Sequence, residues 1–164
     1  MKRALLAMGM LLAAVGALAG PMQIPIAIGD LYQQGQLTLL PDWKPLGKNY
    51  RAAVFVQSAP PRTAATYLAA WTDYELPFPE YYEKEKAYLS IRERMLLDCK
   101  GGKAGISSAS FYAGQFGSGA IVAVKREDKP DMLDVVPDSI EDRLLKQVCP
   151  APKRVRHRAA PHKK

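Results

Sequence analysis

The chain has 164 residues, of which 23 are Lys or Arg and 16 are Asp or Glu, giving a formal net charge of +7. Residues 1–19 hold two of the basic residues and residues 151–164 hold six, so residues 20–150 carry 15 basic against 16 acidic side chains. This length predicts one domain with a single core. The balanced charge of its body argues against a dedicated nucleic-acid-binding domain, which would carry a basic face on the fold itself.

The first residues have the pattern of a secretory signal peptide. Lys2 and Arg3 precede an uncharged, mostly apolar run over 4–19, and Ala17 and Ala19 supply the small residues of a cleavage site. The run is shorter than the roughly 20 apolar residues of a membrane span. We therefore predict a signal peptide over 1–19 and no transmembrane segment in the mature chain, with an uncleaved anchor as the alternative. No cysteine follows the cleavage site, which argues against a lipid anchor there.

Strands dominate the predicted body, which extends over residues 50–150. The preceding segment 20–49 mixes short apolar runs with breakers and leaves a strand and a single helical turn both open. Apolar runs bounded by turn residues predict strands at 52–56, 64–75, 87–99, 106–112, 120–126 and 131–136. Two prolines predict a loop over 76–86.

The run 87–99 alternates with a period of two, as a half-buried strand does. Its apolar face is predicted to carry Leu89, Ile91, Met95, Leu97 and Cys99, and its polar face Tyr88, Ser90, Arg92, Arg94 and Asp98. Glu93 falls on the apolar face, which predicts a bulge or an edge position there.

The period changes to that of a helix at the end of the body. Residues 137–149 place Ile140, Leu144 and Val148 on one stripe. The N-terminal cap is expected at Asp138 or Ser139, with Glu141 or Asp142 completing a capping box. The predicted fold is therefore α+β: an antiparallel meander of about five or six strands, packed with one C-terminal helix.

The chain has two cysteines, Cys99 at the end of a predicted strand and Cys149 at the end of the predicted helix. An even count in an exported chain favours a disulfide between them. The alternative is two separate buried thiols.

Catalytic groups are sparse in the predicted body. Both histidines, His157 and His162, lie in the C-terminal tail, so the body can form neither a Ser-His-Asp triad nor a histidine-based zinc site. The carboxylates Asp73 and Glu75 have the character of a glycosidase pair, but the polar face of a strand is the simpler expectation. We predict a protein without cofactor, metal or catalytic residues, and keep a cryptic hydrolase as a remote alternative.

Two segments are candidates for binding. One is an aromatic loop whose exposed rings would contact a partner: it contains Tyr74, Phe78, Tyr81 and Tyr82. The other is a disordered basic tail over 151–164 that would attract anionic polymers: it contains Lys153, Arg154, Arg156, Arg158, Lys163 and Lys164. Packing of the aromatic residues on the core, and a solvated tail without a partner, are the simpler alternatives.

The order of motifs over roughly residues 50–149 resembles the surface-adhesin protein E family of Gram-negative bacteria. The resemblance rests on a Trp strand, a Tyr-x-Ser strand ending in Asp-Cys, a Tyr strand, a Gly hairpin, a Val-x-Pro-x-Ser motif and a helix closing on Val-Cys. These positions are Trp71, Tyr74, Tyr88, Ser90, Asp98, Cys99, Tyr112, Gly119, Val135, Pro137, Ser139, Val148 and Cys149.

The resemblance implies a small antiparallel sheet backed by a helix, a Cys–Cys link and, in some members, a homodimer. It also implies an exported, non-enzymatic adhesion or binding module of the cell envelope, located in the periplasm or at the cell surface. Host matrix proteins and envelope polyanions are the expected partner classes. The main alternative is a periplasmic, envelope-associated structural protein whose tail holds polyanions.

Overall fold

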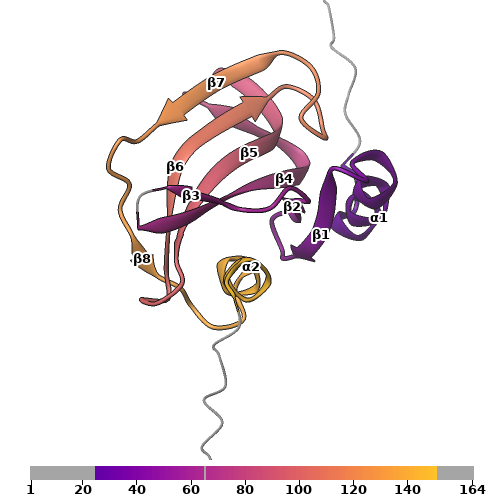
Figure 1. The fold of residues 1–164 in the computed structure, drawn as a ribbon. Coiled ribbons are helices and arrows are strands. Elements are labelled where there is room, and N and C mark those ends of the chain that lie inside the picture. Colours follow the sequence, from indigo (N-terminus) through magenta and orange to yellow (C-terminus); the bar gives the residue numbers. More distant parts are fainter. Residues whose placement is uncertain (1–24, 65, 151–164) are drawn as a thin grey trace, which may run out of the picture.

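The computed structural model describes residues 25–64 and 66–150, so the predicted signal peptide and basic tail lie outside the described residues. Within these ranges, two helices and eight strands follow one another along the chain (Figure 1). Their bounds are α1 Ile28–Thr38, β1 Trp43–Lys48, β2 Ala53–Gln57, β3 Arg62–Ala64, β4 Tyr67–Tyr82, β5 Lys86–Asp98, β6 Lys103–Tyr112, β7 Ile121–Arg126, β8 Leu133–Asp134 and α2 Ile140–Val148.

All these strands belong to one antiparallel sheet. Its main path runs β1-β2-β4-β5-β6-β7, with β3 paired to β4 and β8 paired to β6. Each strand of the main path lies beside its neighbour in this sequence order, as in a meander. The α+β class, the antiparallel meander, the C-terminal helix and the disulfide are therefore confirmed. The short strand β8 is the part of the predicted strand 131–136 that pairs with β6.

The two helices pack on opposite faces of the sheet. Val54 and Val56 of β2 belong to the larger core, which also contains Leu144 of α2. Ala53 and Phe55, which alternate with them, belong to a smaller core with Leu31 of α1. Because successive residues of a strand point to opposite faces, α2 covers one face and α1 the other. Figure 1 shows α1 beside β1 and β2, and α2 under the lower end of the sheet.

The segment 20–49, which the sequence left open, contains an 11-residue helix and strand β1. Helix α1 lies close to the sheet at Gly35, because a Cβ atom there would overlap the Phe55 ring. The rings of Tyr32 and Phe55 stack with centroids 5.6 Å apart. This helix is fixed by its contacts with the sheet rather than by its own amphipathic pattern, which explains why the sequence did not show it.

The predicted loop over 76–86 is wrong. Strand β4 continues to Tyr82, and only residues 83–85 form the turn to β5. The prolines at 77 and 79 are tolerated because the register between β4 and β5 shifts between Glu75 and Glu80, so this stretch makes no regular ladder hydrogen bonds with β5.

Strand β5 confirms most of the predicted alternation. Ile91, Met95 and Leu97 are buried in the core under α2, and a bulge between Arg94 and Met95 follows Glu93 as expected. Tyr88 departs from the prediction, since it is buried in the same core: its ring packs edge-on against Phe111 at a centroid distance of 5.0 Å.

Helix α2 begins as its sequence predicts. The Ser139 hydroxyl accepts a hydrogen bond from the Asp142 backbone N–H at 3.1 Å, and the Asp142 carboxylate accepts one from the Asp138 N–H at 2.9 Å. These bonds satisfy backbone donors at the start of the helix. Ile140 and Leu144 are buried against the sheet, while Val148 is partly buried on the same core.

Candidate functional site

The four predicted partner-binding aromatics lie on strand β4 and divide into two pairs. Tyr74 and Tyr82 pack on the core under α2, and the Tyr82 ring lies 5.3 Å from the Phe111 ring between centroids. Burial raises the pKa of Tyr74 above its usual value. Phe78 and Tyr81 are instead 54% and 62% exposed. The structure therefore leaves only the second pair available at the surface.

A bidentate ion pair fixes this end of β4. Arg51 donates to both carboxylate oxygens of Glu80, at 2.9 and 2.6 Å, and the Tyr88 hydroxyl donates to the same carboxylate at 2.9 Å. The Arg51 guanidinium lowers the pKa of Glu80. Through this pair the turn between β1 and β2 is held beside β4, and that turn carries Tyr50, which is 93% exposed. Three exposed aromatic side chains thus occur on two adjoining segments.

Asp73 and Glu75 form a second polar cluster, but inside the protein. Both side chains are fully buried, on the face of β4 that packs toward α1. Arg92 of β5 donates to the Asp73 carboxylate at 3.3 Å, and the Phe116 N–H donates to Glu75 at 2.7 Å. The two carboxylates do share the polar face of a strand, as the simpler expectation held. That face is covered here rather than solvated.

The cover over the carboxyl pair is the connection between β6 and β7. Arg92 also donates to the Phe116 carbonyl at 3.0 Å, and the Ser90 hydroxyl donates to the Gly114 carbonyl at 2.7 Å and accepts from the Gly117 N–H at 3.0 Å. Phe116 packs on the core under α1. Gly117 has a φ of +64°, and a side chain there would collide with the Arg92 guanidinium. Glycine at 117 therefore allows this connection to close over the pair.

The two buried carboxyl groups of Asp73 and Glu75 share one proton. Asp73 Oδ1 and Glu75 Oε1 have no other hydrogen-bond partner within the described residues. Burial raises the pKa of both carboxyls; the neighbouring Asp73 raises that of Glu75 further, whereas Arg92 restrains that of Asp73. At neutral pH Glu75 consequently holds the proton and can donate it toward Asp73, which is ionised beside Arg92. This arrangement fastens the β6–β7 connection and presents no carboxylate to a substrate.

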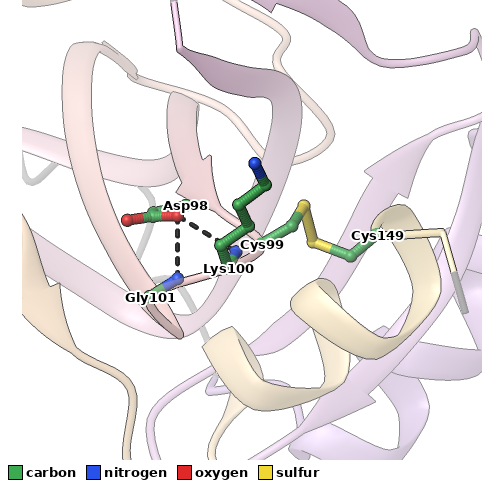
Figure 2. The surroundings of a disulfide bond; sticks show 5 residues. All are labelled: Asp98, Cys99, Lys100, Gly101 and Cys149. Atoms are coloured by element: carbon green, nitrogen blue, oxygen red, sulfur yellow. Dashed lines mark hydrogen bonds between the residues drawn. A yellow bond between two sulfur atoms is a disulfide. The ribbon is translucent and has the colours of Figure 1, made fainter. Parts of the chain in front are cut away.

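The predicted disulfide is present between Cys99 and Cys149, with a Cα–Cα distance of 5.6 Å. Figure 2 shows it joining the turn after β5 to the end of α2. The carboxylate of Asp98, the last residue of β5, accepts hydrogen bonds from the N–H groups of Lys100 and Gly101 in this turn at 3.0 and 2.9 Å. Cys99 is exposed rather than directed into the core, because β5 has ended at Asp98 and the turn projects from the sheet.

Sequence reasoning missed the residues that organise the α1 face. Ser90 and Arg92 were assigned to a polar face, but their bonds to Gly114 and Phe116 could not be foreseen without the course of the β6–β7 connection. The alternation of polar residues in β5 was the available signal. The six basic tail residues lie outside the described residues, so their role stays a prediction.

The described part of the chain contains neither a metal-binding cluster nor a membrane-spanning helix. Within residues 25–64 and 66–150, no three His, Cys, Asp or Glu side chains gather in a way that could hold a metal ion. Neither described helix is long and apolar enough to cross a membrane.

The sequence pattern of the family described as surface-adhesin protein E matches residues 43–150. The structure of this chain is similar to that of Haemophilus influenzae protein E in crystal form II. The TM-score is 0.53 and the sequence identity 18%, with 66% of this chain and 87% of that chain covered. A further structure of Haemophilus influenzae protein E has a TM-score of 0.52 and 18% sequence identity, with 66% of this chain and 84% of that chain covered. The structure of protein E from non-typeable Haemophilus influenzae has a TM-score of 0.52 and 18% sequence identity, with 66% of this chain and 76% of that chain covered. At this identity the likeness shows the fold. No curated protein matches the chain.

Proposed function

This chain belongs to the surface-adhesin protein E family, and on that premise we propose that it is an exported binding module of the bacterial cell envelope that engages a macromolecular partner without catalysis. The observation that carries the proposal is the family match over residues 43–150, which spans all eight strands and α2. The partner classes we propose are host matrix proteins and macromolecules of the envelope. Export by a signal peptide and a homodimeric state are further parts of the proposal.

The exposed aromatics of β4 are the proposed contact surface. Phe78 and Tyr81 lie on a strand whose position is fixed by the Arg51–Glu80 ion pair. Large aromatic side chains bury much area on binding at a low cost in conformational entropy, and interfaces are enriched in them. A fixed strand reduces that cost further, because the backbone is ordered before the partner arrives.

The buried carboxyl pair supports a binding role over the hydrolase alternative. A glycosidase needs both carboxyl groups beside the scissile bond. Asp73 and Glu75 are fully buried, and the Phe116 N–H occupies one oxygen of Glu75. Their geometry serves the connection that covers them.

A binding assay with matched variants tests the proposed surface. We expect the full-length protein to bind one of a panel of immobilised matrix proteins or envelope fractions. The double substitution Phe78→Ser/Tyr81→Ser should weaken that binding roughly tenfold or more, since aromatic anchors dominate interface energies. Leu37→Ser is the control, because Leu37 is 86% exposed but lies on α1. Both variants remove exposed apolar surface and should leave the melting temperature unchanged.

Two results would overturn the proposal. Equal loss of binding in the double variant and in Leu37→Ser would remove β4 as the contact. Retention of the protein in the cytoplasm of the bacterium that produces it, measured by fractionation, would contradict the exported role.

A further inference from the structure

A row of side chains crosses four strands on the face that α1 partly covers. Trp71 of β4 is paired with Arg94 of β5, Arg94 with Ser108 of β6, and Ser108 with Arg126 of β7. Directly paired residues of an antiparallel sheet project from the same face. Trp71 also packs against the core under α1, which places this end of the row next to that helix.

The row lies in two polar pockets that meet at Trp71 and Arg94. The first pocket has a volume of 370 Å³ and extends from these residues to Arg62 and Gln57. The second has a volume of 460 Å³ and extends across β6 to Arg126. Each lies in the range of about 300–1,000 Å³ that is usual for small-molecule sites. The two pockets share Trp71 and Arg94, and we refer to them together as the arginine groove.

The three arginines of the groove are available to a ligand. Among the residues that the structure describes, no carboxylate lies within ion-pair distance of Arg62, Arg94 or Arg126. Arg94 is oriented by a 3.4 Å hydrogen bond to the Ser107 hydroxyl, which donates to the Arg94 carbonyl at 3.0 Å.

The β7 end of the arginine groove is acidic. Glu127 and Asp128 line the second pocket beyond Arg126, so the stretch that favours anions runs from Arg62 to Arg126. The neighbouring Arg92 is not part of it, because its guanidinium is committed to Asp73 and Phe116.

The groups of the arginine groove match those that recognise an anionic ligand rich in hydroxyl groups. Guanidinium groups bind sulfate and carboxylate through paired, charge-assisted hydrogen bonds. Serine hydroxyls both donate to and accept from hydroxyl groups. The indole of Trp71 offers a flat apolar surface beside these polar groups.

We propose that the arginine groove binds a segment of an acidic polysaccharide, with its sulfate or carboxylate groups on Arg62, Arg94 and Arg126 and one sugar ring against Trp71. The inference rests on the binding role proposed above and names one partner class for it. It concerns a surface apart from Phe78 and Tyr81, so either surface can fail while the other stands.

Tryptophan fluorescence of the full-length protein tests the proposal. The chain has two tryptophans, and Trp43 is buried beneath Arg92, so a ligand in the groove should change mainly the emission of Trp71. We expect a sulfated hexasaccharide to shift this emission saturably at fixed salt, and a neutral hexasaccharide to have no effect. Trp71→Phe should abolish the signal.

Charge-matched variants locate the contact. Arg94→Gln and Arg126→Gln should each weaken binding about tenfold or more, the loss typical of a charge-assisted hydrogen bond. Lys125→Gln is the control, since it removes the same charge from the adjacent residue, whose Nζ lies 5.5 Å from the Tyr82 ring on the other face. Replacing the six basic residues of 151–164 by Gln should leave the Trp71 response intact. Arg126 is exposed, so Arg126→Gln remains informative if Arg94→Gln fails to fold.

Three outcomes would overturn the inference. The first is unchanged affinity in both arginine variants, and the second is loss of the signal when the tail alone is neutralised. The third is an equal Trp71 response to hexaglutamate or to a short single-stranded oligonucleotide, which would show a groove for anions in general and not for a saccharide.

Discussion

Glu75 is the residue whose protonation matters most to the α1 face. Its neutral carboxyl accepts from the Phe116 N–H and faces Asp73, whose charge is balanced by Arg92. Burial and the neighbouring Asp73 raise the pKa of Glu75 from 4.5 to about 9. The folded protein therefore holds a proton that the unfolded chain releases over this range.

Replacement of Glu75 by Gln should change how stability depends on pH. The free energy of unfolding of the native protein falls as pH rises from about 4.5 to about 9, because the unfolded state binds fewer protons there. In the variant, the amide side chain supplies a carbonyl for the Phe116 N–H and an N–H for Asp73 at every pH. Denaturant titrations should give similar stability for the two proteins at pH 5. At pH 9 the variant should be more stable by more than about 1 kcal/mol.

Asp73 and Glu93 also have raised pKa values and titrate in both proteins. Because Asp73 and Glu75 interact, the difference between the two curves reports Glu75 together with its effect on Asp73. A difference that stays constant from pH 5 to pH 9 would mean that Glu75 is ionised in the folded protein.

The sequence showed that Asp73 and Glu75 lie two residues apart on one strand, but not that they are buried. Their cover comes from α1, which has no clear pattern of its own, and from the 113–120 connection, whose path depends on contacts with Ser90 and Arg92. Both depend on contacts between residues far apart in the sequence, which local helix and strand propensities do not predict.

Among the elements, α2 is the one that sequence periodicity predicted best. Its cap at Ser139 and its buried stripe follow from residues within the helix itself. Strand β4 is the opposite case. Its second half contains two prolines and was predicted as a loop, yet it is kept extended by pairing of Glu80 to Tyr82 with β5 and by the Arg51–Glu80 ion pair.

Substitution of Leu144 by Ala measures what α2 contributes. Leu144 is 1% exposed in the core under α2, so the cavity left by Ala should lower the free energy of unfolding by about 2–5 kcal/mol. Gln147→Ala, at an exposed position of the same helix, should cost much less. Thermal or denaturant unfolding measures both. Indistinguishable melting temperatures for the two variants would mean that the helix is peripheral to the fold.

At the scale of the whole molecule, the disulfide joins the middle of the sheet to the end of helix α2. It closes a loop with a sequence separation of 50. In the chain-entropy model such a link contributes about 4 kcal/mol, by restricting the unfolded state.

Removal of the link should lower stability without changing the fold. We expect Cys99→Ser/Cys149→Ser to unfold at lower denaturant concentration, with a loss of the order of 4 kcal/mol. Because Cys99 is exposed and Cys149 only partly buried, the variant leaves no large cavity. Unfolding curves under non-reducing conditions measure the loss, and circular dichroism checks the fold. Unchanged stability would show that removal of the disulfide does not increase the conformational entropy of the unfolded chain.

The sheet, the C-terminal helix and the disulfide were predictable from the sequence, whereas helix α1 and the arginine row were not. Alternation in β5, the caps of α2 and the pair of cysteines predicted a meander, a C-terminal helix and their covalent link, all of which the structure contains. The second layer over the sheet could not be predicted, because α1 is positioned by the close approach of Gly35 to Phe55. The arginine row depends on strand register, which no single strand specifies.

The position of the disulfide also determines how the protein would respond to mechanical tension. A pull applied at Pro150 reaches Cys149 first and passes through the sulfur bridge to Cys99, directly after β5. Strand β5 lies inside the sheet, between β4 and β6, and is bonded to both along most of its length. Tension from the C-terminal side therefore bypasses α2 and is carried by the hydrogen bonds of β5 to both of its neighbours, instead of peeling the helix away turn by turn.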